Sequence, residues 1–536
     1  MSGNFGELRP NHLHSGIDLK TDGKEGLHVF AAADGYISRI KISPFGYGNA
    51  LYITHSNGYI TVYGHLQSYN TKINEYVKKV QYQRESFEID IFPTPNELKV
   101  KQSEIIALSG NSGGSEGPHL HFEIRDDKSE WPINPLFFDF NIADTIKPSI
   151  SLIEVYPLNE ISFVNNRNTP IKVDVQNDKK TGILSLSTKD TIRVHGIIGF
   201  GIITTDTENG SSNPNGTYSV ALNIDGETVY EHSIDKFSFD QTRYVNAHID
   251  YAEKIKNSIK IQRSFVSPNN KLPIYKIKKK RGVYVFNDDS IHSVIYTVKD
   301  IFNNSSELSF IVLSDSKVKM SELPISSPNY AATFLFDHIN TFKTKNISID
   351  FPKNVLYEDL KFDYFMSDSI KGFSPIHHIH YETIPLHSSY SLFIKGNVPD
   401  SLKKKALIVS LDEKGKPTSE GGEWTKNGVL TKTRSFGNFS ISIDTVAPII
   451  KAININADKN VAKNKTLEMG IYDNLSGIAS YRGTMDNKWI LFEYDAKERR
   501  LFYTFDDSIK SGEHTLELTV KDNKGNTSKY YANIKR

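Results

Sequence analysis

Residues 117–124 read Gly-Pro-His-Leu-His-Phe-Glu-Ile, and this stretch decides how the first part of the 536-residue chain is interpreted. Apolar residues alternate there with His119, His121 and Glu123, and a period of two predicts a β-strand. Both histidines then project from one face of the strand, about 7 Å apart at the backbone. Either both imidazoles bind one metal ion, or one binds it while the other stands beside it.

Two further histidine clusters lie upstream of this strand. His14 and Asp18 are four residues apart, so on a straight strand their Cα atoms would lie about 13 Å apart. They can share a metal ion only if the chain bends between them, and Gly16 is the residue that permits a bend. Residues 63–66, Tyr-Gly-His-Leu, form the other cluster. Each cluster alone is common without a function, but the three together are far less expected by chance.

The donor types in these clusters favour zinc. Imidazole and carboxylate ligands suit this ion, and a site with three protein ligands leaves a position open for water, as catalytic sites do. The chain contains no cysteine, which excludes a thiol nucleophile, a disulfide framework and any cysteine-ligated zinc or iron–sulfur site.

Taken together, these motifs resemble the lysostaphin and LytM type of zinc metallopeptidases, which cleave peptidoglycan peptides. The shared pattern is His-x3-Asp, then Tyr-x-His-Leu, then a glycine-rich turn that runs into Gly-Pro-His-x-His-Phe. The resemblance covers residues 4–136, about a quarter of the chain. The layout, with β modules after the peptidase, is similar to that of such peptidases from Bacteroidetes.

The resemblance implies a role for five residues. His14, Asp18 and His121 would bind zinc, and His65 and His119 would be catalytic histidines that do not bind it. A zinc-bound water would attack the scissile carbonyl, with His119 as general base and His65 as donor to the oxyanion or the leaving amine. The implied activity is that of a zinc-dependent metalloendopeptidase acting on stem or cross-link peptides of peptidoglycan. The sequence does not say which bond is cut.

One departure from the pattern is an insert, Ser68–Leu98. Residues 86–93 alternate between apolar and polar side chains, which predicts a strand. We expect the insert to form a wall or flap over one end of the metal cleft and to narrow its substrate range. The alternative is a docking surface for the following β modules.

The remainder of the chain shows an internal repeat. Asp-Thr-Ile-Lys-Pro at 144–148 recurs as Asp-Thr-Val-Ala-Pro at 444–448, and Thr-Val-Lys-Asp occurs at both 297–300 and 519–522. Turn residues and β-branched and aromatic residues are abundant, and helical periodicity is rare.

These patterns predict a mainly β protein with four domains. The first, at 1–143, is an antiparallel-β peptidase domain of the lysostaphin type. It is followed by three β-sandwich domains. These are an Ig-like module at 144–316, a β-rich module at 317–443 and an Ig-like module at 444–536. Short helices are expected near 74–80 and 399–404.

Charge and hydropathy narrow the class of protein further. Lys and Arg number 64 against 63 Asp and Glu, and this balance argues against a dedicated nucleic-acid binder. No apolar run approaches the length of a membrane span. Peptidoglycan lies outside the cytoplasm, so we expect an export signal upstream of Met1 and a location in the periplasm, the cell envelope or the extracellular space.

Two other functions stay open. The chain could be a non-catalytic envelope scaffold or hydrolase activator, although the complete five-residue set speaks against this. It could also be a metallopeptidase of envelope proteins, with the β modules as docking domains for a protein partner. Two motifs are set aside: His378 and His380 are expected on one face of a surface strand, and residues 473–477 are interpreted as a turn rather than a calcium loop.

Overall fold

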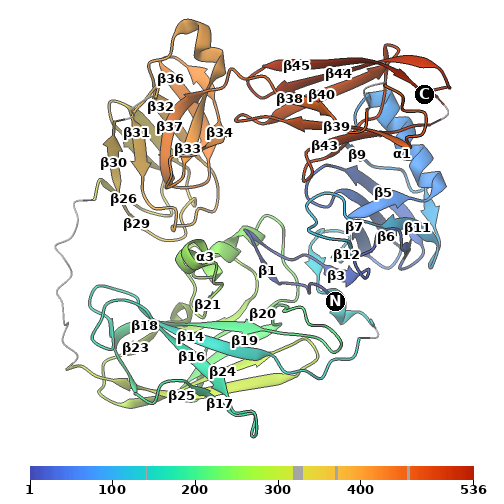
Figure 1. The fold of residues 1–536 in the computed structure, drawn as a ribbon. Coiled ribbons are helices and arrows are strands. Elements are labelled where there is room, and N and C mark those ends of the chain that lie inside the picture. The colour runs from blue at the N-terminus through green and yellow to red at the C-terminus, as the bar shows by residue number, and fades with distance from the viewer. Residues whose placement is uncertain (141, 318–329, 369–371, 456–458, 507) are drawn as a thin grey trace.

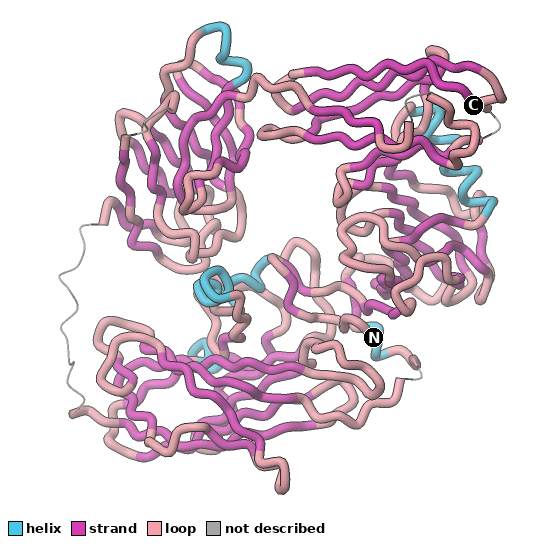
Figure 2. Tube along the Cα trace, in the orientation of Figure 1, coloured by secondary structure: helices cyan, strands magenta, loops and turns pink. Residues whose placement is uncertain are grey.

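The computed structural model describes residues 1–140, 142–317, 330–368, 372–455, 459–506 and 508–536. The described chain is mainly β, as predicted from the sequence (Figure 2). The division into four domains stays a prediction. Residues 318–329, near the start of the third predicted domain, lie outside the described residues. We refer to 1–143, 144–316, 317–443 and 444–536 as the first to fourth regions. None of the helices in the described ranges has both the length and the apolar character that crossing a bilayer requires.

The first region is built on an eight-stranded sheet of order β10-β5-β6-β7-β12-β13, with β3 beside β12 and β9 beside β5. A smaller sheet of order β4-β11-β8 covers it, and the apolar core lies between them. The elements are β1 (Leu8–Arg9), β2 (His12–Leu13), β3 (Ile17–Lys20), β4 (His28–Phe30), β5 (Gly35–Ile42), β6 (Asn49–His55), β7 (Tyr59–Gly64), β8 (Leu66–Tyr69), α1 (Thr71–Arg84), β9 (Ile89–Ile91), β10 (Lys99–Val100), β11 (Ile105–Ser109), β12 (His119–Asp126), β13 (Pro132–Ile133) and the 3-10 helix η1 (Pro135–Phe137).

The insert Ser68–Leu98 folds as helix α1 followed by strand β9. Asn70 caps the helix, because its side-chain oxygen accepts a hydrogen bond from the Ile73 amide at 3.0 Å. Ile73 and Val77, one turn apart, are buried and pack on the core. The strand pairs antiparallel with β5 and buries both of its isoleucines. The expected helix and the expected apolar strand are therefore both present.

The second region is a large twisted sheet system of twelve strands around one apolar core. Its elements are β14 (Ser149–Pro157), β15 (Phe163–Val164), β16 (Ile171–Asn177), β17 (Leu184–Leu186), β18 (Ile192–Thr205), β19 (Ser219–Ile224), β20 (Glu227–Ser233), η2 (Thr242–Tyr244), α2 (Val245–His248), α3 (Tyr251–Asn257), β21 (Gln262–Arg263), β22 (Tyr275–Lys278), η3 (Lys279–Gly282), β23 (Tyr284–Phe286), β24 (Ile291–Lys299) and β25 (Ser305–Ser314).

The third region has two five-stranded sheets over a common core, with a short two-stranded pair beside them. Its elements are β26 (Ala332–Phe334), β27 (Asn340–Lys343), β28 (Ile347–Phe351), β29 (Leu360–Phe362), β30 (Tyr364–Ser367), β31 (Ile376–Ile379), β32 (Tyr390–Lys395), η4 (Asp400–Lys405), β33 (Ala406–Leu411), β34 (Pro417–Gly421), β35 (Glu423–Thr425), β36 (Gly428–Thr433) and β37 (Gly437–Ile443). The helical turn η4 lies where a short helix was predicted.

The fourth region has two four-stranded sheets that share one core. Its elements are β38 (Ile449–Ala452), β39 (Thr466–Tyr472), β40 (Ile478–Met485), β41 (Lys488–Trp489), β42 (Glu493–Asp495), β43 (Arg500–Thr504), β44 (Glu513–Asp522) and β45 (Thr527–Lys535).

The four regions form a closed ring in which each one contacts the next, and the fourth returns to the first (Figure 1). A cluster of apolar side chains, including Phe5, Phe237 and Tyr357, joins the first, second and third regions. Polar contacts at the four junctions include Leu13 N to Thr242 Oγ1, Asn269 Nδ2 to Leu356 O, Lys405 Nζ to Asn526 Oδ1, and Arg482 to Glu85. The ring fixes the peptidase-like region between two β regions.

Candidate metal centre and cleft

Strand pairing brings the predicted ligands together. Strand β3 runs antiparallel to β12, and Asp18 lies directly opposite His121, so their side chains share a face of the sheet. His14 reaches the same point because the chain turns before β3. Gly16 is required there for a reason that the sequence did not show: a Cβ at this position would lie 2.3 Å from the Phe122 carbonyl oxygen.

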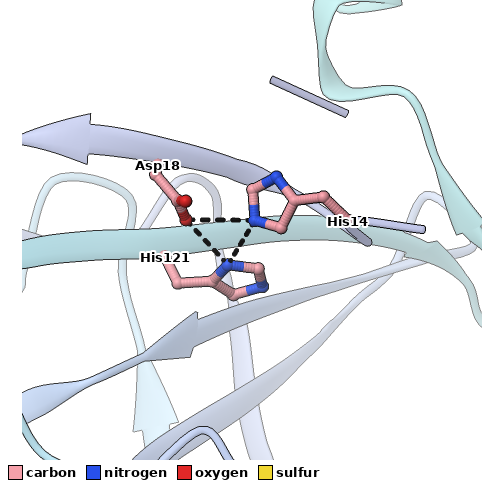
Figure 3. Close-up of side chains that lie close together, drawn as sticks. All are labelled: His14, Asp18 and His121. Atoms are coloured by element: carbon pink, nitrogen blue, oxygen red, sulfur yellow. Dashed lines mark hydrogen bonds and ion pairs between the residues drawn. The ribbon is translucent and has the colours of Figure 1, made fainter. Parts of the chain in front are cut away.

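The three side chains converge on one point, as Figure 3 shows. Asp18 Oδ1 lies 3.1 Å from His14 Nε2 and 3.0 Å from His121 Nδ1. The two ring nitrogens are 3.1 Å apart. Ligand atoms of a tetrahedral zinc ion lie about 3.3–3.6 Å from one another when each is about 2.0–2.2 Å from the metal. The triangle is therefore close to the size that zinc requires, and all three residues are buried.

Hydrogen bonds to the outer ring nitrogens set the direction of the inner ones. His14 Nδ1 lies 2.7 Å from the Asn4 carbonyl oxygen, and His121 Nε2 lies 2.8 Å from Glu123 Oε1. Both partners are acceptors, so in neutral imidazoles the outer nitrogen carries the proton and the inner nitrogen presents its lone pair. Two lone pairs and a carboxylate oxygen then face one space, which is the donor set of a bound zinc ion.

A buried network fixes Glu123 behind His121. Its carboxylate accepts hydrogen bonds from Ser15 Oγ at 2.6 Å, Tyr47 Oη at 2.5 Å and Arg125 Nε at 2.6 Å. Burial acts to raise the pKa of Glu123, but the charges of Arg125 and His121 outweigh it and hold this pKa well below its usual range. Glu123 is thus a buried anion that orients a predicted ligand.

Charge around His121 favours a cation at this point. Burial acts to lower its pKa, but hydrogen bonds to the Asp18 and Glu123 carboxylates raise the pKa of His121 to about 9. Hydrogen bonds from His119, His121 and His14 hold the pKa of Asp18 well below its usual range against the effect of burial. A metal ion would replace the proton on His121 as the positive charge between two carboxylates.

The two remaining predicted histidines flank this point. The ring centroids of His65 and His119 are 4.8 Å apart, and His119 Nε2 lies 3.4 Å from Asp18 Oδ1. Backbone carbonyls accept from both rings: Ser112 O lies 2.8 Å from His65 Nδ1, and Gly117 O lies 2.8 Å from His119 Nδ1. In the tautomer with Nδ1 protonated, Nε2 of each ring carries the lone pair. Burial, together with the neighbouring His121, lowers the pKa of His65 to about 3.

A cleft opens at the metal centre, and its walls come from two regions. The first region contributes all five predicted site residues, and the second contributes Asn213, Phe239 and Thr242. Phe239 also lies under the Arg125 guanidinium, 4.5 Å from the ring centroid. These second-region residues were not found in the sequence, because they enter the site through contacts between distant parts of the chain.

The insert takes no part in the cleft. Every residue of Ser68–Leu98 is described, and none lines it. The predicted flap is therefore wrong, and the alternative of a docking surface fits the contacts. Helix α1 faces the fourth region, where Lys78 pairs with Asp506 and Tyr82 packs edge-on against Trp489. The apolar alternation correctly predicted an ordered segment, but it could not tell which side of the sheet the segment covers.

The fourth region also contacts the loop that precedes β12. Lys497 Nζ donates to the carbonyl oxygens of Asn111 and Ser115, the latter at 3.0 Å. Ser115 Oγ in turn lies 3.1 Å from His119 Nδ1. One surface lysine of the last region is thus two hydrogen bonds from a predicted catalytic histidine.

Family models match two parts of the chain. Residues 12–82 match the model of peptidase family M23, and residues 331–444 match that of a Zu5-like domain. The N-terminal part of the chain is therefore an M23 peptidase domain, which confirms the resemblance to lysostaphin- and LytM-type peptidases. The M23 match covers the first predicted ligands, and the Zu5-like match lies in the third region.

Relatives are similar over about a fifth of this chain. The DD-carboxypeptidase/endopeptidase Mpg of Neisseria meningitidis is 35% identical over 124 residues, which is 23% of this chain and 22% of that protein. The peptidoglycan DD-endopeptidase ShyC of Vibrio cholerae is 35% identical over 99 residues, 18% of this chain and 17% of that protein. The matches thus span about a fifth of the length of these relatives.

Solved structures align over the same part. The catalytic domain of lysostaphin from Staphylococcus simulans is 24% identical with a TM-score of 0.19, covering 25% of this chain and 87% of that one. A zinc-containing peptidase from Vibrio cholerae is 28% identical with a TM-score of 0.17, covering 23% of this chain and 29% of that one.

Proposed function

We propose that this protein is a zinc-dependent metalloendopeptidase that hydrolyses peptide bonds in peptidoglycan. The observation that carries the proposal is the triangle of His14 Nε2, His121 Nδ1 and Asp18 Oδ1, with edges of 3.0–3.1 Å, at the base of a cleft. The peptidoglycan substrate is proposed from relatives that are named as DD-endopeptidases.

In this proposal His14, Asp18 and His121 would hold the zinc ion. Zinc, when bound, lowers the pKa of a bound water toward about 7 and polarises the scissile carbonyl. The Glu123 carboxylate and the Asn4 carbonyl hold the two imidazoles in the tautomers that expose their inner nitrogens.

His119 and His65 handle the protons. When Nδ1 of His119 donates to the Gly117 carbonyl, its Nε2 carries the lone pair, so His119, whose Nε2 lies near Asp18, takes the proton of the attacking water. His65 is neutral before the reaction, because its pKa is lowered to about 3 by burial. It can therefore donate to the leaving amine only after it has accepted the proton that His119, 4.8 Å away between ring centroids, has taken from the water.

The proposed location follows from the substrate. Peptidoglycan lies outside the cytoplasm, so the protein acts in the periplasm or elsewhere in the cell envelope. The β regions then position the peptidase, and a protein partner in the envelope would bind through them. Fractionation of cells with an antibody to the fourth region tests this: recovery with the cytoplasmic marker alone would contradict it.

Defined muropeptides test the activity. Purified protein should release products of lower mass, a chelator should stop the release, and added zinc should restore it. His119→Ala serves as the control for contaminating hydrolases. Cleavage of casein but of no muropeptide would instead indicate a peptidase of envelope proteins. Cleavage of neither by zinc-loaded protein would indicate a scaffold.

A further inference from the structure

Three aspartates of the second region gather at one end of its sheet. Asp144 precedes β14, Asp206 follows β18 and Asp300 follows β24, and one carboxylate oxygen from each lies within 4.8 Å of the others. Asp206 is 5% exposed and Asp300 is 1% exposed. Burying several carboxylates together is costly unless a positive charge compensates them.

Several oxygens at this point are buried without any donor in the part of the chain that the structure describes. These atoms are Asp206 Oδ1, Asp144 Oδ2 and Asn215 Oδ1. Asn215, 3% exposed, lies opposite Asp206 in an antiparallel bridge, so its side chain stands on the same face as the Asp206 carboxylate. Buried acceptors are nearly always satisfied in folded proteins, and a bound cation satisfies several converging ones at once.

The electrostatics of Asp206 agree with this arrangement. Burial raises the pKa of Asp206 to about 7, and the charges of Asp300, Asp144 and Glu208 act in the same direction. Glu208 lies two residues further on, is also buried, and has its pKa raised by burial. Repulsion among these carboxylates therefore destabilises their ionised forms.

The donor chemistry selects the ion. All available ligands are carboxylate or amide oxygens, the set that Ca²⁺ and Mg²⁺ prefer and that differs from the imidazole-rich zinc centre. Two ligands on opposite sides of a Ca²⁺ ion, each about 2.4 Å away, lie about 4.8 Å apart. An irregular set drawn from separate loops suits the flexible coordination of Ca²⁺ better than the octahedron of Mg²⁺.

We propose that Asp144, Asp206, Asp300 and Asn215 bind one Ca²⁺ ion and that this ion stiffens the loop 206–216. The end of this loop is hydrogen-bonded to the M23 peptidase domain. Gly216 N donates to Asn4 Oδ1 at 3.0 Å, and Asn4 Nδ2 donates to Gly216 O at 2.6 Å.

Asn4 links this contact to the candidate metal centre, because its carbonyl oxygen accepts a hydrogen bond from His14 Nδ1 at 2.7 Å. A small cavity lined by Asn4, Asp206 and Glu208 lies at the same junction. The cation site would thus support the position of a proposed zinc ligand from the neighbouring region. Ca²⁺ binding itself does not depend on the peptidase function proposed above.

The fourth region supplies a matched control. Asp444, Asp473 and Asp522 form a similar triad, in which Asp444 and Asp522 stand at the repeated positions. Both Asp444 oxygens there accept backbone N–H groups, from Val446 and Ser476. Asp473 is only half-buried, and one of its oxygens accepts from two amides of its own turn. Asp473 Oδ1 is buried without a donor in the described ranges, but it is the only such carboxylate oxygen among these three residues, so we assign no ion to this triad.

Calcium titration of the full-length, zinc-loaded protein tests the proposal. Isothermal titration should show one Ca²⁺ site, which is lost in Asp206→Asn and kept in Asp473→Asn. At a hundredfold excess over Kd, Ca²⁺ should raise the midpoint of thermal unfolding by about 5 °C in the wild type. Equal concentrations of Mg²⁺ should give a smaller shift.

The isosteric variant gives a second readout of opposite sign. Without Ca²⁺, Asp206→Asn should unfold at a higher temperature than the wild type, because one buried charge is removed. The same Ca²⁺ response in Asp206→Asn and the wild type would overturn the proposal, as would no response in the wild type. A variant less stable than the Ca²⁺-free wild type would also contradict it, because it would give the carboxylate a role in folding alone.

Discussion

Two strands of this protein carry histidines close together in sequence, β12 in the first region and β31 in the third, and only β12 contributes to a cluster of metal donors. On β31, both ring nitrogens of His378 form hydrogen bonds with neutral partners: Nδ1 with Asn438 Oδ1 at 2.6 Å and Nε2 with Ser367 Oγ at 2.8 Å. His377 is fully buried and bonds the Tyr364 hydroxyl at 2.9 Å. His380 does not share a strand face with His378 as expected, because the strand ends at Ile379 and His380 has a φ of 49°.

The difference lies in what the neighbouring strand provides. Opposite His121 stands Asp18, and the rings of His14 and His121 each direct one nitrogen toward it because an acceptor bonds the other nitrogen. Opposite His378 stands Asn438, whose amide oxygen binds a ring nitrogen without supplying a charge. A histidine pair thus becomes a metal centre when an adjacent strand places a carboxylate at the same register and the outer nitrogens are already occupied.

The largest effect is expected from removing a ligand. His14→Ala should reduce muropeptide hydrolysis to the background rate, because the metal site loses one of three donors and the activated water with it. The initial rate with zinc in excess measures this. Activity within tenfold of the wild type would remove His14 from the ligand set.

The next effect concerns the proton carriers. His119→Ala and His65→Ala should each lower kcat about 10²- to 10⁴-fold while the zinc content stays at the wild-type value. Parallel measurement of kcat and metal content separates these histidines from the ligands. Loss of zinc from His119→Ala would show that the two histidines of β12 have exchanged roles.

A smaller effect should follow from the buried carboxylate behind the site. Glu123→Gln keeps the shape but removes the charge that orients His121, so zinc affinity should fall about 10- to 100-fold. Competition with a chromogenic chelator measures it. An unchanged zinc affinity would mean that the contact with Asp18 is sufficient to orient the imidazole of His121.

The contact from the fourth region should matter least among the active-site changes. Lys497→Ala removes the two hydrogen bonds to the loop 111–115 and should lower kcat only about two- to tenfold, with zinc content unchanged. Lys488→Ala, an exposed lysine of the same region, is the matched control. Equal rates in both variants would show that the loop holds His119 without this contact.

For strand β31 the comparison predicts no effect on zinc binding or hydrolysis. His378→Ala should leave zinc content and hydrolysis unchanged, because its ring bonds only neutral side chains. Loss of zinc from this variant would make β31 a metal site and break the distinction between the two strands.

The sequence predicted the local parts of the site and missed the distant ones. Alternation over residues 117–124 was sufficient to place His119 and His121 on a strand, and Glu123 already stood in the same alternating series. The orientation of that carboxylate toward His121 depends on Arg125 and Tyr47, which the pattern does not reveal.

Contacts between regions could not be predicted from a single sequence. Phe239 and Thr242 reach the cleft because an apolar cluster packs the second region against the first, some 230 positions away. For the insert Ser68–Leu98, the periodicity identified an apolar face but not the neighbour of the segment. That neighbour is the fourth region, which contacts helix α1. The mainly β class needed only composition and alternation, and it is confirmed.

Anomalous X-ray diffraction at the zinc edge, with crystals of the zinc-loaded protein, tests the central claim most directly. The account predicts one strong peak, about 2.0–2.2 Å from His14 Nε2, His121 Nδ1 and an Asp18 oxygen, with His119 outside bonding distance. A peak bound to His119 instead of His121, a peak at β31, or no peak at this triangle would contradict it.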